Sequence, residues 1–212
     1  MTLDDNPRGV QAIAISSAFS GVALAVILMR LYTRLFIVHC AGVEDYFVTF
    51  AMMCSMGLTV TIAIQAMCGM GQHFAELKSD NMQHSLEAFY ASLLVYNLSL
   101  GLIKTSILLQ YRRVFTTRRF QVVCWLVLTA VVIHTTWSVL GSILACLPVR
   151  AFWTKETPAK CIDQFSMWFT NAGINITTDF IIILLPIPVI KSLNLAKRQK
   201  LALMGIFAVG GL

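Results

Sequence analysis

Two ionisable side chains stand alone inside long apolar segments of this sequence, and they are the first candidates for chemistry. Lys104 is the only charged residue of segment 88–111, and Asp179 is the only charged residue of segment 165–190. A charge at the centre of a membrane-spanning helix costs about 2.5–3.5 kcal/mol on insertion scales, so such residues usually serve a purpose. If both segments are helices that enter from the same side, Lys104 lies about 24 Å and Asp179 about 21 Å along them. We therefore predict an ion pair.

This pair has two interpretations. As a structural clamp it would neutralise both charges and hold two helices together, and Lys104 could also extend its ammonium group to the nearer interface. As a switch or an ion-linked site it would take part in function directly. The sequence favours the structural interpretation and leaves the other open.

A polar stripe runs along one face of segment 165–190. Asn171, Asn175 and Asp179 follow one another at intervals of four residues, and Thr178 lies beside them. In lipid such a stripe must face protein or a water-filled cavity. It either lines a ligand or ion pocket or supplies hydrogen bonds between helices, worth about 0.6 kcal/mol each, and the second interpretation is favoured.

Three of the six cysteines, Cys68, Cys146 and Cys161, are expected on or near the outer surface, where disulfides can form. Cys146 and Cys161 bracket a short loop, and a bond between them would stabilise it. Cys68 competes as a partner, and the sequence does not decide between them. No CxxC motif and no His/Cys cluster at metal spacing is present, so we expect neither a metal nor a cofactor.

Glycines and prolines mark the ends of two predicted helices. Gly69, Gly71 and His73 form an expected turn at the outer surface, where glycine ends a helix and permits tight turns. Pro186 and Pro188 remove two backbone donors near the inner end of segment 165–190 and should kink it. We expect a static bend, with a hinge as the alternative.

Four arginines, Arg112, Arg113, Arg118 and Arg119, lie between the third and fourth predicted helices. They are expected to contact anionic lipid of the inner leaflet, and they are also a candidate docking site for a cytoplasmic signalling partner. Lipid contact alone is enough to explain them.

The segments that carry these residues are too apolar for a soluble domain. Of 212 residues, 58% are hydrophobic and only 12% are charged, whereas soluble chains have about 25% charged residues. About 20 apolar residues span the bilayer core as a helix, and barrel strands would instead alternate in polarity. We predict an all-α polytopic transmembrane helical bundle with helices at about 10–37, 46–68, 88–111, 120–147 and 165–190, and a sixth, shorter one at 201–212.

We attribute the net charge of +6 to the orientation of the chain in the membrane and not to a nucleic-acid partner, because basic residues gather on the cytoplasmic side of membrane proteins. Ten basic residues fall in the connections of one side: Arg30, Arg34, Arg112, Arg113, Arg118, Arg119, Lys191, Lys197, Arg198 and Lys200. Five fall on the other: Arg8, Lys78, Arg150, Lys155 and Lys160. We predict that the first side is cytoplasmic, that residues 1–9 are an extracellular N-terminus, and that segment 201–212 is part of a helix of a longer protein.

Taken together, the motifs resemble the fungal rhodopsin-domain family of integral membrane proteins. They are Arg30-Leu-Tyr-Thr-Arg34, Gly69-x-Gly71-x-His73, Lys104 through Phe115, Cys146-Leu-Pro148 with Trp153 and Cys161, Asn175 with Asp179, Leu185-Pro-Ile-Pro188, and Lys200-Leu. The sequence departs from the family pattern at Gly42-Val43-Glu44-Asp45, where a glycine followed by paired aspartates is usual. The resemblance implies that residues 10–212 are an incomplete seven-helix domain.

It also implies a receptor-like plasma-membrane protein of the orphan G-protein-coupled type. We do not expect an enzyme, because the sequence contains no nucleophile elbow, no metal motif and no paired acids in a plausible site. An extracellular small-molecule or lipid ligand would enter near the Gly69–His73 turn and the Cys146–Cys161 loop, and the basic loops would face a cytoplasmic signalling partner. The family name implies no chromophore here, because rhodopsins bind retinal through a lysine on the seventh helix and Lys104 lies on the third. A transporter or channel, and a nonfunctional truncated product, remain alternative hypotheses.

Overall fold

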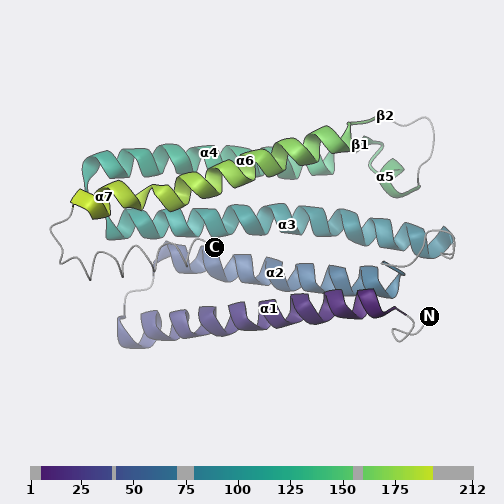
Figure 1. The fold of residues 1–212 in the computed structure, drawn as a ribbon, viewed down its shortest axis with the longest axis horizontal. Coiled ribbons are helices and arrows are strands. Elements are labelled where there is room, and N and C mark those ends of the chain that lie inside the picture. Colours follow the sequence, from purple (N-terminus) through teal and green to yellow (C-terminus); the bar gives the residue numbers. More distant parts are fainter. Residues whose placement is uncertain (1–5, 40–41, 71–78, 155–159, 193–212) are drawn as a thin grey trace.

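The computed structural model describes residues 6–39, 42–70, 79–154 and 160–192, which are mostly helical (Figure 1). The long helices are α1 (Pro7–Tyr32), α2 (Val43–Met67), α3 (Ser79–Val114), α4 (Arg118–Ile143) and α6 (Gln164–Leu184). A turn of π-helix, η2 (Thr33–Ile37), continues α1, and a short helix, α7 (Pro186–Ser192), follows α6. A single helical turn, α5 (Ala151–Thr154), lies between two-residue strands β1 (Cys146–Leu147) and β2 (Lys160–Cys161).

Within the described residues, five helical segments are long and apolar enough to cross a membrane, and they confirm the predicted polytopic bundle. The segments are Pro7–Ile37, Val43–Met67, Met82–Val114, Arg118–Ile143 and Gln164–Val189. The shortest has 25 residues, which is about 37 Å of helix against a hydrocarbon core of about 30 Å. Large apolar side chains such as Phe19, which is 74% exposed, cover their outer faces, as expected for surfaces solvated by lipid. The chain is a multi-pass helical membrane protein.

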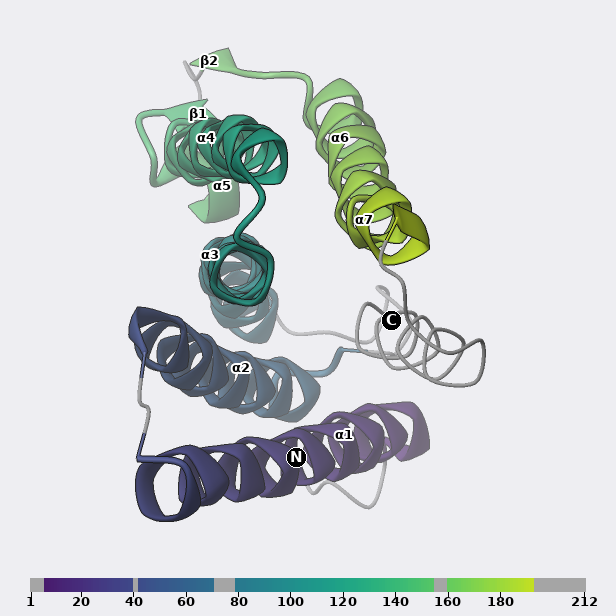
Figure 2. The same cartoon turned by 90° about the vertical axis from the view of Figure 1, so that its left-hand side faces the viewer.

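The long helices lie roughly side by side, and α3 occupies the centre (Figures 1 and 2). α1 packs on α2, α2 on α3 and α3 on α4, while α6 packs on both α4 and α3. The strands and α5 gather at the end of the bundle where α1 begins, and η2 and α7 lie at the opposite end (Figure 1). We call these the β-strand end and the α7 end.

Close packing holds α3 against α4. A Cβ atom on Gly101 of α3 would overlap the side chain of Thr135 on α4, so only glycine permits this approach. Toward the α7 end, a cluster of buried apolar side chains joins α3, α4 and α6. Its members are Leu108, Tyr111, Phe115, Phe120, Cys124, Leu128, Val131 and Ile182. These contacts fix the relative positions of the three helices that carry the polar residues described below.

Several helix ends have clear local causes. The Asn6 side chain accepts a hydrogen bond from the Gly9 amide at 3.1 Å and caps α1. The helix begins at Pro7, whose missing amide hydrogen would have no acceptor at this position. After α2, Gly69 has a φ of 97°, the left-handed conformation that ends many helices, as predicted for this turn. Gly71 and His73 of the same predicted turn lie outside the described residues.

Three predicted boundaries need correction. The helix predicted over 88–111 is longer and begins at Ser79, because the charged residues before position 88 do not end it. The helix predicted over 120–147 ends at Ile143, because residues 146–147 pair with residues 160–161 as antiparallel strands. The helix predicted over 165–190 is interrupted at Leu185, directly before Pro186, which has no amide hydrogen to continue the ladder. Pro188 lies within α7. The predicted segment 201–212 lies outside the described residues.

Candidate polar site in the helical bundle

Lys104 lies in the interior of the bundle and binds α6. Its side chain is 7% exposed, and its Nζ lies 3.1 Å from Asp179 Oδ1. The same ammonium group donates to the backbone oxygen of Asn175 at 2.9 Å, to Thr178 Oγ1 at 2.7 Å and to Asn175 Oδ1. The structure thus brings the two predicted partners together and adds neutral oxygens that complete the ammonium group's hydrogen bonds. Asp179 is 47% exposed, so the lysine is the more deeply buried member of the pair.

The remaining member of the α6 stripe, Asn171, binds α4. Ser138 Oγ donates a hydrogen bond to Asn171 Oδ1 at 3.2 Å, and it also lies 3.5 Å from His134 Nε2. The stripe therefore faces protein along its length: Asn171 toward α4, and Asn175 and Asp179 toward Lys104 of α3. Hydrogen bonding between helices, the favoured interpretation of the stripe, accounts for the Oδ1 atom of each of the two asparagines.

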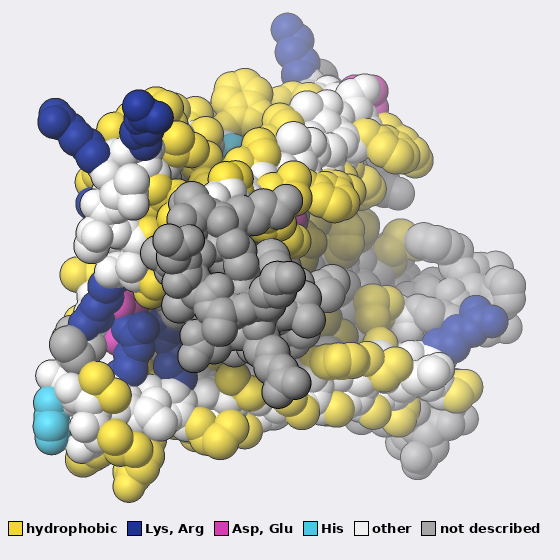
Figure 3. Space-filling model, turned by 60° about the vertical axis from the view of Figure 1, so that its left-hand side comes forward, with side chains coloured by type: hydrophobic (Ala, Val, Ile, Leu, Met, Phe, Trp, Pro, Cys, Tyr) yellow, Lys and Arg dark blue, Asp and Glu magenta, His cyan; other side chains and the backbone are white. Residues whose placement is uncertain are grey.

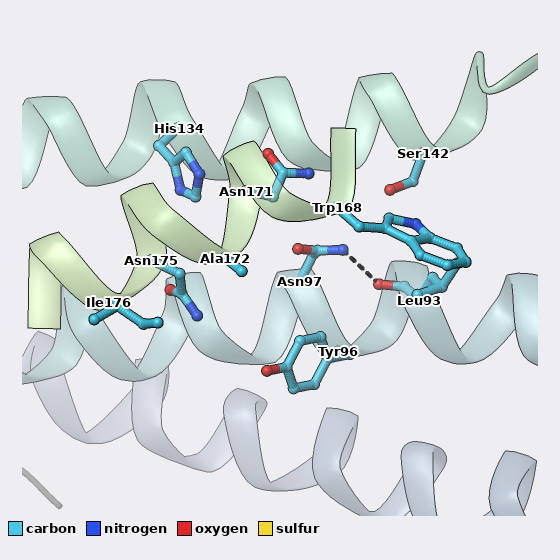
Figure 4. A pocket seen from close by; sticks show the side chains of 10 residues that line it. All are labelled: Leu93, Tyr96, Asn97, His134, Ser142, Trp168, Asn171, Ala172, Asn175 and Ile176. Carbon is cyan, nitrogen blue, oxygen red and sulfur yellow. Dashed lines mark hydrogen bonds between the residues drawn. The ribbon is translucent and has the colours of Figure 1, made fainter. Parts of the chain in front are cut away.

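A pocket of about 310 Å³ lies where α3, α4 and α6 meet (Figure 4). Its lining residues are Leu93, Tyr96, Asn97, His134, Ser142, Trp168, Asn171, Ala172, Asn175 and Ile176. Trp168, Leu93 and Ser142 lie at one end of the pocket, and His134 and Ile176 at the other (Figure 4). A small hollow beside it shares Asn97, His134 and Asn175 and reaches Lys104. Asn171 and Asn175 of the α6 stripe therefore also line a cavity. A ligand or ion pocket was the alternative interpretation of this stripe.

Asn97 and His134 are pocket residues that the sequence argument missed. Neither residue is a lone charged side chain in an apolar segment, and neither belongs to the polar stripe of segment 165–190. A search of segments 88–111 and 120–147 for uncharged polar side chains would have included both, together with several serines and threonines. Tyr96 and Trp168 carry no such signal, because aromatic residues are common along membrane helices.

The loop between α4 and α6 covers the β-strand end of α3. Cys146 and Cys161 form a disulfide, with Cα atoms 4.1 Å apart, and are direct partners in the β1–β2 pair. Cys68, the competing candidate, is free. Between the strands, Phe152 and Trp153 pack on Tyr90 of α3 with ring centroids 5.2 and 5.6 Å away. The disulfide closes the loop on itself, and the ring contacts hold it against α3.

At the α7 end, five charged residues form a cluster that joins α1, η2, α2 and α3, which we call the arginine–carboxylate cluster. Glu44 accepts from Arg34 Nη1 at 2.5 Å and from Arg113 Nη1 at 2.7 Å. Asp45 lies 3.1 Å from Arg34 Nη1 and 3.3 Å from Arg30 Nε. Figure 3 shows basic side chains next to carboxylates at this end of the molecule. Both carboxylates are only 6% exposed, whereas the side chains of their arginine partners are 20–36% exposed.

Further bonds hold the cluster in place. Ser106 Oγ of α3 donates to the backbone oxygen of Glu44 at 2.8 Å, and Asp45 Oδ2 accepts from the Gly42 amide at 3.1 Å at the start of α2. The departure of Glu44 from the paired-aspartate pattern is therefore compatible with a structural role: its longer side chain reaches arginines of two different helical segments.

The four arginines proposed to contact lipid divide into two pairs. Arg113 binds Glu44, and Arg112 donates to Gln121 Oε1 at 3.1 Å and lies 4.0 Å over the Trp125 ring. Arg118 and Arg119 are exposed. The first pair thus has partners within the chain, a feature that the sequence did not reveal. For the second pair, contact with lipid or a partner stays a prediction. Among the described residues, no group of three or more His, Cys, Asp or Glu side chains is arranged to hold a metal ion.

These features define a polytopic helical membrane protein with a polar pocket between helices. Residues 29–212 match the model of the fungal rhodopsin domain. The chain belongs to that family, as the sequence motifs indicated.

Three curated fungal proteins are similar to it. One is the Polyenoic acids biosynthesis gene cluster protein Ba17b of Metarhizium anisopliae, 25% identical over 92% of this chain and 55% of that protein. Another is Receptor GIN3 of Arthrobotrys oligospora, 24% identical over 97% of this chain and 51% of that protein. An SAT4 family membrane protein of Emericella nidulans is 28% identical over 67% of this chain and 38% of that protein. The chain spans about half the length of the first two relatives. No solved structure matches it significantly.

Proposed function

We propose that this chain is the main part of a receptor-like protein of the plasma membrane, which takes a small molecule from the outer side into the pocket between α3, α4 and α6. The pocket itself is the observation that supports this proposal most directly. Hydrogen-bonding side chains of three helices line it, and a smaller hollow beside it reaches Lys104. One relative is named as a receptor, which supports the same role. The site residues are assigned to binding and not to catalysis.

A route from the pocket to the inner surface lies along α3. Lys104 meets α6 beside the pocket, and Arg113 of the same helix enters the arginine–carboxylate cluster. The two residues are about 14 Å apart along the helix. In the proposal, a ligand that engages Asn175 shifts α6 against Lys104, and the change reaches the cluster and the exposed Arg118 and Arg119. The basic side of the bundle is assigned to the cytoplasm, where a signalling partner would bind.

The test uses the full-length protein in lipid nanodiscs and four probes with one chain length: octan-1-ol, octanamide, octanoate and octylamine. We expect at least one probe to bind saturably and to raise the thermal midpoint. Ala172→Trp should abolish this effect, because the indole would fill the pocket, whereas Thr177→Val on the exposed side of α6 should leave it unchanged.

Three results would contradict the proposal. The first is the absence of saturable binding for all four probes, and the second is binding that survives Ala172→Trp. The third is protein-dependent accumulation of the bound probe inside proteoliposomes, which is the outcome that the transporter hypothesis predicts.

A further inference from the structure

Resting on the proposed function, the geometry points to a ligand class: we infer that the pocket takes an uncharged amphiphile with a hydroxyl or amide head and an apolar body. Three features of the pocket carry this inference: the hydrogen-bonding groups that remain open in it, the compensation of the nearby charges, and its aromatic end. Each constrains a different part of the ligand.

The three pocket asparagines offer one acceptor and two donors to a ligand. Asn97 Nδ2 donates to the Leu93 backbone oxygen at 2.8 Å, and Figure 4 shows Asn97 Oδ1 turned away from that bond. Asn171 and Asn175 each use Oδ1 as an acceptor, from Ser138 and Lys104. Within the described residues, no group donates to Asn97 Oδ1 or accepts from the Nδ2 groups of Asn171 and Asn175.

Open donors and acceptors in an apolar setting favour a ligand that satisfies both kinds. An amide oxygen or hydroxyl oxygen can accept from the two Nδ2 groups, and a hydroxyl or N–H hydrogen can be donated to Asn97 Oδ1. A ligand without such a head would leave these groups unpaired, and unpaired buried polar groups weaken binding.

The charges near the pocket do not favour a charged ligand. The pocket residues include no Asp, Glu, Lys or Arg in the part of the chain that the structure describes. The nearest ammonium group, Lys104 Nζ, already binds Asp179 and oxygens of Asn175 and Thr178. A carboxylate or an ammonium ligand would lose its hydration without gaining a free counter-charge, unless it displaced some of these partners of Lys104.

The end of the pocket at Trp168 and Leu93 is rich in apolar surface (Figure 4). Trp168 and Tyr96, which also lines the pocket, are 41% and 45% exposed and provide ring surface. The volume of about 310 Å³ is at the lower end of the range for small-molecule sites. This end suits an aliphatic or aromatic body of modest size.

The experiment compares dissociation constants of the four octyl probes for the wild-type protein in nanodiscs. We expect octan-1-ol and octanamide to bind at least about tenfold more tightly than octanoate and octylamine. Tighter binding by octanoate or octylamine through the same pocket, lost in Ala172→Trp, would overturn the ligand class and leave the proposed function intact. Failure of every probe would overturn both. This comparison needs no variant of the asparagines.

Variants then test the roles of the amides. Asn97→Leu and Asn171→Leu should each weaken octanamide binding by about twofold to tenfold, the range for one hydrogen bond. Thr177→Val is the matched control, since its hydroxyl bonds only to the Gly173 carbonyl among the described residues. Unchanged octanamide affinity in folded Asn97→Leu and Asn171→Leu proteins would contradict the assignment of the head group to these amides.

Discussion

At the scale of single residues, Lys104 has the environment that most constrains the site. It carries a charge in the interior of the bundle and meets four oxygen atoms, all from α6. Asp179 supplies the opposite charge from a half-exposed position. The pair therefore holds α3 against α6 beside the pocket. We expect its loss to lower the stability of the protein before it changes ligand binding.

We predict that Lys104→Met and Asp179→Asn each destabilise the protein by about 1–3 kcal/mol, the range for hydrogen bonds to charged groups. That loss corresponds to a fall of roughly 2–12 °C in the thermal midpoint in detergent. The double variant should recover part of the loss, because both charges disappear together. Strictly additive losses would show that the two charges are not coupled.

Glu44 gives a second prediction at this scale. Glu44→Gln removes the negative charge that Arg34 and Arg113 share, leaving two arginines close together, so we expect a loss of about 1–3 kcal/mol of stability. Glu87→Gln is the matched control: this side chain is 56% exposed and lies 3.7 Å from His84, so its loss should change stability by about 0.5 kcal/mol or less. Equal effects of the two changes, measured by thermal unfolding, would contradict a structural role for the cluster.

The sequence predicted the Lys104–Asp179 pair because each charge stands alone in an apolar segment. It did not predict the arginine–carboxylate cluster, although all five of its residues are charged residues of the sequence that had been assigned to the same side of the membrane. Arg34 and Glu44 are ten positions apart, but Glu44 and Arg113 are 69 apart, and only the packing of α2 on α3 brings them together. Pairings of this kind depend on tertiary structure and not on local pattern.

At the scale of elements, the close approach of α3 and α4 positions the pocket. Gly101→Ala should destabilise the protein by about 1–3 kcal/mol, because the new methyl group would overlap Thr135 and push the helices apart. Gly173→Ala on α6 meets no atom within 4 Å and should be neutral or stabilising by up to about 1 kcal/mol, from helix propensity alone. Thermal midpoints of the two variants check this, and a stable Gly101→Ala protein would show that the helices are not in contact there.

The elements themselves were largely predictable from hydropathy, and their ends were not. Apolar runs located the five spans, since the bilayer imposes a minimum length. Cys146 and Leu147 look like the continuation of an apolar helix, yet they form a strand because their partner residues lie beyond the intervening loop. The choice of Cys161 over Cys68 as disulfide partner has the same origin.

At the scale of the whole molecule, orientation in the membrane is a prediction from the distribution of arginine and lysine. It places the disulfide loop outside and the arginine–carboxylate cluster inside. A membrane-impermeant thiol reagent, applied to intact cells after mild reduction, should therefore label Cys161, which is exposed. Cys124, which is buried, should resist labelling and serves as the control. Labelling of Cys161 only after permeabilisation would reverse the predicted orientation.

The central claim is that occupation of the pocket alters the helices at the inner surface. The most direct measurement is the distance between spin labels at Thr116 and Leu184, two exposed positions near the α7 end. The labels would be placed on full-length protein in nanodiscs, in which Cys40, Cys54, Cys68 and Cys124 have been replaced with alanine so that the labels attach only at the two chosen positions.

We predict that the octyl probe that binds saturably shifts this distance distribution, and that Ala172→Trp abolishes the shift. An unchanged distribution at saturating probe, or the same shift in the Ala172→Trp protein, would contradict the account.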